Sequence, residues 1–203
     1  MIVLALYLWA LSEWPLPVKA VTSALLAAAS DLVAQRLLGA RRVSWRRSML
    51  MSLFGLCWYG PSNHAWQGLL VRLFPPVPRG RGSAVGGLLR IAQRVGLDQL
   101  LYAPVNNCLM ILYVSLVADR RGWRAARAKV VSELPGVQRR GWRVWPVLQL
   151  VNQSVVPLEF RVLVNNVCSL CWTAFVIMST RGAAHRKLPV YSMSTARLHP
   201  HDN

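Results

Sequence analysis

The chain has 203 residues, of which 54% are hydrophobic and only 15% are charged, and its formal net charge is +17. A soluble domain carries about 25% charged residues, and the mean hydropathy of +0.34 is high for one. The basic residues fall between apolar segments long enough to span a bilayer, which disfavours a nucleic-acid-binding protein despite the charge. The length suggests one domain at 1–180, followed by a basic tail at 181–203 that we expect to be disordered.

The N-terminal region is expected to hold an interfacial helix followed by the first membrane span. Residues 2–11 are apolar but too few to cross a bilayer, and they lack the basic start and small-residue cleavage site of a signal peptide. Pro15 marks the expected break before the first candidate span at 20–38, whose Ala and Ser residues allow close helix approach. Within this span Asp31 and Gln35 are four residues apart and share one helix face.

Two further apolar stretches, 48–74 and 95–118, are the second and third candidate spans. Both contain prolines, which lack an amide hydrogen and are expected to break the helices. Arg94 and Asp98 are four residues apart, so we expect an ion pair that offsets part of the cost of placing a carboxylate in a membrane. The prolines and polar residues of interest in and beside these stretches are Pro61, His64, Arg94, Asp98, Gln99 and Pro104.

The last apolar block, 144–179, is too long to be one straight helix across a hydrocarbon core of about 30 Å. Pro157 disfavours a continuous helix, so we expect a shorter bent helix at 144–156 and a final span at 158–179. Polar side chains gather around this break, namely Gln149, Asn152, Glu159 and Arg161.

The connectors at 39–47, 75–90 and 119–143 are basic, and the third contains eight Lys and Arg residues. The sequence predicts an all-α integral membrane bundle of about four transmembrane helices, with a short N-terminal interfacial helix and a proline-broken helix before the last span. With four spans, the first and third connectors lie on one side, which the positive-inside rule favours as the cytoplasmic or matrix side, and the tail lies on the other. The third connector would suit anionic lipid headgroups.

Ten polar residues of the apolar segments form the candidate functional set: Asp31, Gln35, His64, Arg94, Asp98, Gln99, Gln149, Asn152, Glu159 and Arg161. They could line a hydrated lumen in which an ion or metabolite exchanges its water shell for side-chain contacts. Alternatively, they hydrogen-bond across helices and only stabilise the bundle. A charge at the bilayer centre costs at least about 2.5–3.5 kcal/mol, whereas interhelical hydrogen bonds contribute about 0.6 kcal/mol on average. Three acids in apolar segments therefore favour the lumen, with the scaffold as the alternative.

An enzyme is not expected from this sequence. It contains no recognisable Ser/His/Asp arrangement, no metal-ligand cluster and no phosphate-binding glycine loop. Cys168 and Cys171 have the spacing of a redox or metal pair, but no second pair or histidine cluster lies near them in the sequence, so we interpret them as small apolar side chains. We therefore expect no cofactor and no metal.

The sequence also contains a specific pattern, W-x-x-W-P-x-x-Q-x-x-N-x-x-x-V-P-x-x-x-R, which runs from Trp142 to Arg161. Other fragments occur in a fixed order, namely Asp31 with Gln35, Gly60-Pro61 with His64 and Trp66, Asp98-Gln99 with Ala103-Pro104, and Trp172. Together they resemble the Mpv-seventeen / twenty-two-kilodalton peroxisomal membrane protein family. Gln153 departs from the family pattern, where an aromatic residue usually follows the asparagine.

The resemblance implies a four-helix integral protein of the mitochondrial inner membrane or the peroxisomal membrane. Family members are associated with channel-like permeability to ions or small metabolites and with organelle homeostasis. Basic connectors suit a cardiolipin-rich membrane, which favours the mitochondrion. The expected partners are the bilayer, anionic lipid, small solutes and a second copy of the chain, with no direct contact to nucleic acid. A non-conducting scaffold or adaptor whose basic loops bind anionic lipid or proteins is the alternative.

Overall fold

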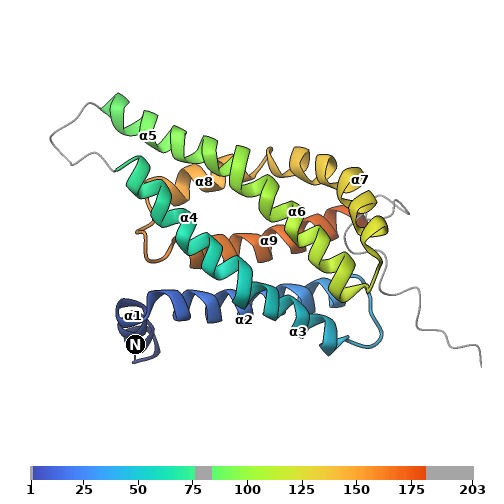
Figure 1. Cartoon of the computed structure of the whole chain (residues 1–203). Helices are drawn as coiled ribbons and strands as arrows, with labels where there is room; N and C mark the ends of the chain where they lie inside the picture. Colours follow the sequence, from blue (N-terminus) through green and yellow to red (C-terminus); the bar gives the residue numbers. More distant parts are fainter. Residues whose placement is uncertain (1, 76–83, 182–203) are drawn as a thin grey trace, which may run out of the picture.

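The computed structural model describes the backbone of residues 2–75 and 84–181 and the side chains of 5–75 and 85–173, and every element in these ranges is helical (Figure 1). The helices are α1 (Ile2–Glu13), α2 (Pro15–Leu37), α3 (Trp45–Phe54), α4 (Gly60–Leu73), α5 (Ala84–Leu97), α6 (Ala103–Tyr113), α7 (Trp123–Gly141), α8 (Trp145–Ser154) and α9 (Arg161–Arg181). Three π-helical turns continue α3, α5 and α6, namely η1 (Gly55–Tyr59), η2 (Asp98–Tyr102) and η3 (Val114–Ala118). The predicted tail after residue 181 lies outside the described residues.

The bundle has two sides that meet around a polar interior. On one side α2 packs against α3, η1, α4 and α9. On the other side α6 packs against α7 and α5 packs against α8 (Figure 1). Contacts of α9 with α8 and of α3 with η3 join the two sides.

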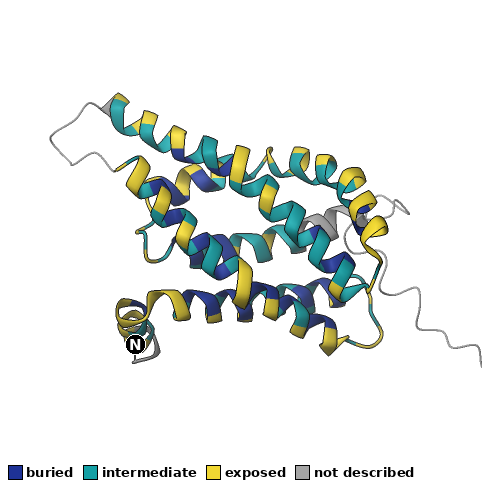
Figure 2. Ribbon diagram, viewed as in Figure 1, coloured by how far each residue is buried: buried dark blue, intermediate teal, exposed yellow. Residues whose placement is uncertain are grey.

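Large apolar side chains remain exposed on the outer faces of the bundle, such as Leu25 and Leu100 at 66% each (Figure 2). This inside-out distribution suits a protein whose outer surface contacts lipid. By length and hydropathy, two described helices could cross a membrane, Pro15–Leu37 and the continuous helix Val85–Ala118. The finer count of four spans stays a prediction.

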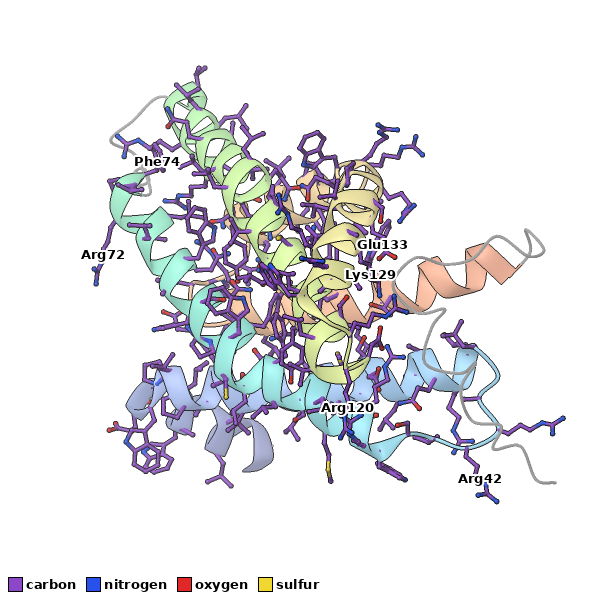
Figure 3. The ribbon with its side chains drawn as sticks, turned by 45° about the vertical axis from the view of Figure 1, so that its right-hand side comes forward. Arg42, Arg72, Phe74, Arg120, Lys129 and Glu133 are labelled. Atoms are coloured by element: carbon purple, nitrogen blue, oxygen red, sulfur yellow. The ribbon has the colours of Figure 1, made fainter. Side chains whose placement is uncertain are left out.

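The segment 119–143 is not the connector that the sequence analysis expected. Most of it forms α7, a 19-residue helix that packs along α6 and runs back across the bundle, and α8 continues in the same direction (Figure 1). Because of this additional return, α9 ends near the loops that carry Arg42 and Arg120, opposite the end with Arg72 (Figures 1 and 3). α9 therefore ends on the same side of the bundle as the first connector, whereas the sequence analysis expected the last span to end on the opposite side.

Pro61 and Pro104 do not break their helices, contrary to expectation. A proline lacks the amide that would bond four residues back, and its ring crowds that carbonyl. The chain resolves the conflict with a π turn directly before each proline, so that Gly60 N bonds to Gly55 O and Ala103 N bonds to Asp98 O, five residues back. The expected break at Pro157 lies between α8 and α9.

The π turn before Pro104 leaves a backbone carbonyl free for tertiary contacts. Ala103 N bonds to Asp98 O, so Gln99 O loses its usual helical donor. The side chains of Gln138 and Trp142 donate to this carbonyl instead, each over 3.3 Å. The carbonyl left free before Pro104 thus accepts the two hydrogen bonds that attach α7 to the middle of the long α5–α6 helix.

The π turn before Pro61 brings α4 very close to α2. Gly55 and Gly60 are five residues apart and both face α2, where a Cβ would lie 2.7 Å from Ser23 O and 2.7 Å from Ala20 Cα, respectively. These distances are too short for any side chain, and the obstructing atoms belong to the α2 backbone. Small residues at membrane helix interfaces allow this kind of approach.

Replacing either of these glycines by alanine should therefore destabilise the bundle. We expect Gly55→Ala and Gly60→Ala each to lower the free energy of unfolding in detergent by about 1–3 kcal/mol, as overpacked cores do. Gly68→Ala in α4 is the matched control, because no atom lies within 4 Å of the added methyl group. Thermal unfolding of the three purified variants measures the effect, and equal midpoints for all three would contradict the close contact.

Candidate functional site

A first polar cluster, centred on Asp31, fastens α2 to α3. Gln35 Nε2 donates to Asp31 Oδ2 over 2.7 Å, and Gln35 Oε1 accepts from Ser44 N over 2.7 Å. Ser48 Oγ donates to Asp31 Oδ2 over 2.8 Å, and Arg47 Nε lies 3.0 Å from Asp31 Oδ1. Asp31 is 3% exposed, and its charge is both paired and hydrogen-bonded, as a buried carboxylate requires. The cluster therefore serves the fold.

A second cluster fixes the bend between α8 and α9. Arg161 donates from Nη1 to Gln153 Oε1 (2.8 Å) and from Nε to Val156 O (3.1 Å). Gln153 Nε2 in turn donates to Gln67 Oε1 of α4 over 2.7 Å. Gln153, the residue that departs from the family pattern, thus links the bend to α4.

Asparagines of α9 join this helix to its neighbours. Asn165 Oδ1 accepts from Gln149 Nε2 (3.3 Å) and from Asn152 Nδ2 (2.9 Å) of α8. Asn166 Nδ2 donates to Ser23 Oγ of α2 over 2.8 Å. The three helices are therefore connected through side-chain amides on the interior faces of the bundle.

The expected ion pair between Arg94 and Asp98 is not formed. The Arg94 guanidinium instead donates to Phe74 O, at 2.9 Å from Nε, where α4 ends (Figure 3). Helix ends leave carbonyls without an amide donor and carry partial negative charge, so this end competes well for an arginine that points back along its own helix. Asp98 accepts from Trp66 Nε1 (3.0 Å) and from Gln99 Nε2 (3.1 Å), and neither donor is charged.

Two other predicted site residues lie at the same end of the bundle as Phe74. Glu159 is exposed in the turn between α8 and α9 and therefore does not lie in the interior of the bundle. The chain reverses there and leaves the carboxylate free to be hydrated. His64 is partly buried, and its Nδ1 lies 3.3 Å from Lys19 Nζ, which links α4 to α2.

Hydrogen bonds between side chains join α4 to the α5–α6 helix along a line that we call the α4–α6 seam. Its three contacts are Trp58 Nε1 to Asn106 Oδ1 (3.2 Å), Ser62 Oγ with Tyr102 Oη (3.1 Å) and Trp66 Nε1 to Asp98 Oδ1 (3.0 Å). Successive partners are four residues apart on both helices and run in opposite directions, as expected for antiparallel neighbours. The rings of Trp66 and Tyr102 also stack, with centroids 5.4 Å apart.

Behind the seam lies a cavity of about 330 Å³ between the two sides of the bundle. Its volume falls within the range of about 300–1,000 Å³ typical of small-molecule sites. Arg140 of α7 lines the cavity and is also exposed, so the cavity reaches the surface beside α7. The polar residues of its lining are Ser30, Asp31, Tyr59, Asn63, Asp98, Gln99, Tyr102, Asn106, Asn107, Arg140, Gln149, Asn165, Asn166, Ser169 and Thr173.

Some of these cavity-lining groups are poorly bonded within the protein. Asn63 is fully buried, and its amide meets the Tyr59 hydroxyl without forming a hydrogen bond of ordinary geometry to any described residue. Gln149 Oε1 is also buried and has no hydrogen-bond partner among the described residues. A buried amide without partners costs free energy, so these groups indicate that water or a solute occupies the cavity.

Comparison with known proteins decides the family. Peroxisomal membrane protein PMP22 of Arabidopsis thaliana is 31% identical over 175 residues, which cover 86% of this chain and 88% of that protein. The chain belongs to the Mpv17 / PMP22 family. The family model itself matches residues 115–176.

Further relatives of this Mpv17 / PMP22 family member cover most of the chain as well. Protein sym-1 of Neurospora crassa is 32% identical over 82% of this chain and 92% of that protein. Peroxisomal membrane protein 2 of Bos taurus is 29% identical over 85% of this chain and 87% of that protein. No solved structure matches. The family is one of organelle membrane proteins.

In this family member the structure divides the ten predicted site residues. Those that line the cavity are Asp31, Asp98, Gln99 and Gln149. The remaining six do not line it, namely Gln35, His64, Arg94, Asn152, Glu159 and Arg161. Most of the latter fasten helix ends and bends, which is the role that the scaffold interpretation gave to the whole set.

Several cavity residues were not in the predicted set. Asn63 and Tyr59 are four residues apart on one helix face, as are Asp98, Tyr102 and Asn106, so helical periodicity could have found them. Arg140 could not have been found this way because its segment was interpreted as a connector rather than a helix.

If Asn63 serves an occupant of the cavity rather than the fold, its removal should be tolerated. We expect Asn63→Leu to leave the thermal midpoint in detergent nearly unchanged, because only the contact with Tyr59 is lost and a poorly bonded buried amide disappears. Asn165→Leu is the control and should lower the stability by about 1–3 kcal/mol, since two buried donors lose their acceptor. A larger loss for Asn63→Leu than for Asn165→Leu would show that Asn63 is structural.

Proposed function

We propose that this chain conducts small solutes across an organelle membrane through its polar cavity, with a preference for cations over anions. The observation that carries the proposal is the combination of Asp98 and Asn63 in one cavity. Asp98 is 2% exposed and, among the described residues, no Lys, Arg or His forms an ion pair with it. Asn63 is buried in the same cavity lining and contacts only the Tyr59 hydroxyl, without a hydrogen bond of ordinary geometry to a described residue.

The two buried aspartates of the spans have different surroundings, which supports separate roles for them. Asp31 has Arg47 as a cationic partner, whereas Asp98 has only the neutral donors of Trp66 and Gln99. A buried carboxylate without a cation is costly unless it is hydrated or meets a mobile cation. A carboxylate in a water-filled cavity could stabilise a passing cation while the seam holds the side chain in place.

The membrane that holds the protein and the class of its activity belong to the same proposal. We propose the mitochondrial inner membrane, because the basic segments suit its anionic lipid, with the peroxisomal membrane as the alternative. The names of two relatives, peroxisomal membrane protein PMP22 and peroxisomal membrane protein 2, support that alternative. We also propose that the chain is not an enzyme.

Removal of the Asp98 charge should reduce cation selectivity without unfolding the protein. A carboxylate about 4 Å from a cation in water contributes about 1 kcal/mol, so we expect Asp98→Asn to lower the cation-to-anion permeability ratio by about fivefold. The measurement is the reversal potential under a salt gradient in planar bilayers of purified protein.

Glu159→Gln is the matched control because it removes the same charge from an exposed turn outside the cavity. Its permeability ratio should equal that of the unmodified protein. No conductance from the unmodified protein, or an unchanged ratio in well-folded Asp98→Asn, would contradict the proposed role of Asp98.

A second function, anchoring to anionic lipid or an acidic partner, is favoured by the arrangement of the basic loops. Arg42 and Arg120 come from different connectors but lie at one end of the bundle (Figure 3). Both residues are exposed. Arg46 donates to the carbonyls of Val117 and Ala118, which holds the two loops together. Basic clusters beside a membrane surface gain about 1 kcal/mol per residue from anionic lipid.

Binding of cardiolipin should therefore depend on which end of the bundle loses its charges. We expect the double variant Arg42→Gln/Arg120→Asn to retain less cardiolipin in native mass spectrometry, with asparagine chosen because Arg120 has a positive φ of 51°. The double variant Arg72→Gln/Arg90→Gln at the opposite end is the control and should retain it. Equal retention by both double variants would contradict a specific basic surface.

A further inference from the structure

The α4–α6 seam has a second hollow on its outer side. This outer groove has a volume of about 400 Å³ and is lined by Trp58, Ser62, Ala65, Trp66, Leu69, Leu101, Tyr102, Val105 and Asn106. Its rim is apolar and open to the surroundings, since Leu69, Leu101 and Val105 are 43%, 53% and 54% exposed. In a membrane, such a surface contacts lipid chains rather than water.

Only the seam separates this outer groove from the polar cavity. Tyr102 and Asn106 line both hollows. Trp66 lines the groove, and its indole bonds to Asp98, which lines the cavity. The wall between lipid and polar interior is therefore one side chain thick, and three side-chain hydrogen bonds close it.

Together the two hollows match an amphiphile, because the outer groove is apolar and the cavity behind it is polar. The groove offers aromatic and aliphatic surface for a hydrocarbon chain. The cavity directly behind it offers hydrogen-bonding groups that the protein uses little or not at all, namely the Gln149 Oε1 acceptor and the Asn63 amide, which only contacts the Tyr59 hydroxyl. A free chain without a polar end would leave these groups unpaired, at a cost in free energy.

We propose that the seam is a lateral portal at which a single-chain amphiphile binds, with its chain in the groove and an uncharged, hydroxylated headgroup reaching the cavity. The headgroup chemistry follows from the charges around it. Asp98 and the amide oxygens of Asn63 and Gln149 accept hydrogen bonds from hydroxyl groups, whereas they would repel a carboxylate or phosphate. Arg140 also lines the cavity, but it comes from α7 on the far side from α4.

Binding requires the seam to open, and its construction permits this at a modest cost. Each contact is a single hydrogen bond, worth about 0.5–1.5 kcal/mol net. A headgroup hydroxyl could replace Ser62 as the partner of Tyr102, while Ser62 keeps its hydrogen bond to Tyr59 O. The proposal concerns entry from the membrane and holds whether or not the cavity conducts ions.

The test uses the full chain in nanodiscs and a monoacylglycerol with a diazirine in its acyl chain. Photolabelling followed by peptide mapping should place saturable label within 58–69 and 101–106. Leu101→Trp fills the groove and should reduce this label at least about tenfold. Leu100→Trp is the matched control, because Leu100 is 66% exposed and does not line the groove, and its labelling should be unchanged.

Headgroup selection is tested by competition. Unlabelled monoacylglycerol should displace the probe, and a fatty acid anion of equal chain length should compete at least about tenfold more weakly. Asn63→Leu should weaken competition by the monoacylglycerol while the fold is retained. Equal competition by the two lipids would overturn the headgroup assignment. Label spread evenly over the exposed apolar faces, or crosslinks between two copies of the chain through the groove, would overturn the portal.

Discussion

The division between the polar cavity and the outer groove depends on the register between α4 and the α5–α6 helix. Residues four apart in an α-helix are out of phase by about 40°, because each residue advances the helix by about 100°. Residues spaced four apart on each helix therefore turn away from the facing helix after a few turns. The π turns at 55–59 and 98–102 widen the helices where the seam passes, which counters this rotation. Prolines that conflict with the α-helix thus produce the geometry that aligns Trp58, Ser62 and Trp66 with their partners.

The distribution of satisfied and unsatisfied polar groups separates structure from function. At one end, Asp31 is paired and hydrogen-bonded by α3, and at the other end Arg161 is hydrogen-bonded beside the α8–α9 bend. Between them, Gln149 Oε1 has no hydrogen-bond partner among the described residues, and the Asn63 amide contacts only the Tyr59 hydroxyl. The ends of the bundle are thus fastened by charged side chains with several partners each, while the middle retains hydrogen-bonding capacity. A bundle designed only for stability would show the reverse, because unpaired buried amides are most costly far from water.

The sequence predicted the helical class and several helix ends, but it could not predict how the helices pair. Spacing was enough to place Asp31 and Gln35 together, since both lie on one helix. The four-residue spacing of Arg94 and Asp98 led to the wrong prediction of an ion pair. Arg94 bonds instead to Phe74 O at the end of α4, and no local sequence pattern shows that α4 ends beside it. The many basic residues of 119–143 led to the prediction of a connector, but most of this segment forms α7, which packs along α6. Pro61 and Pro104 were expected to break their helices because proline lacks an amide hydrogen, but a π turn before each of them lets the helix continue.

The weak bonding of Asn63 also affects how this position should change over evolutionary time. The free energy of folding gives natural selection little reason to keep an asparagine there, because the side chain contacts only the Tyr59 hydroxyl and forms no hydrogen bond of ordinary geometry. Asn165, which accepts two buried hydrogen bonds, is retained by stability alone. A lineage that lost the activity of the cavity but still needed a folded membrane protein should replace Asn63 by an apolar residue first. The two asparagines would therefore record different selective pressures within one helix bundle.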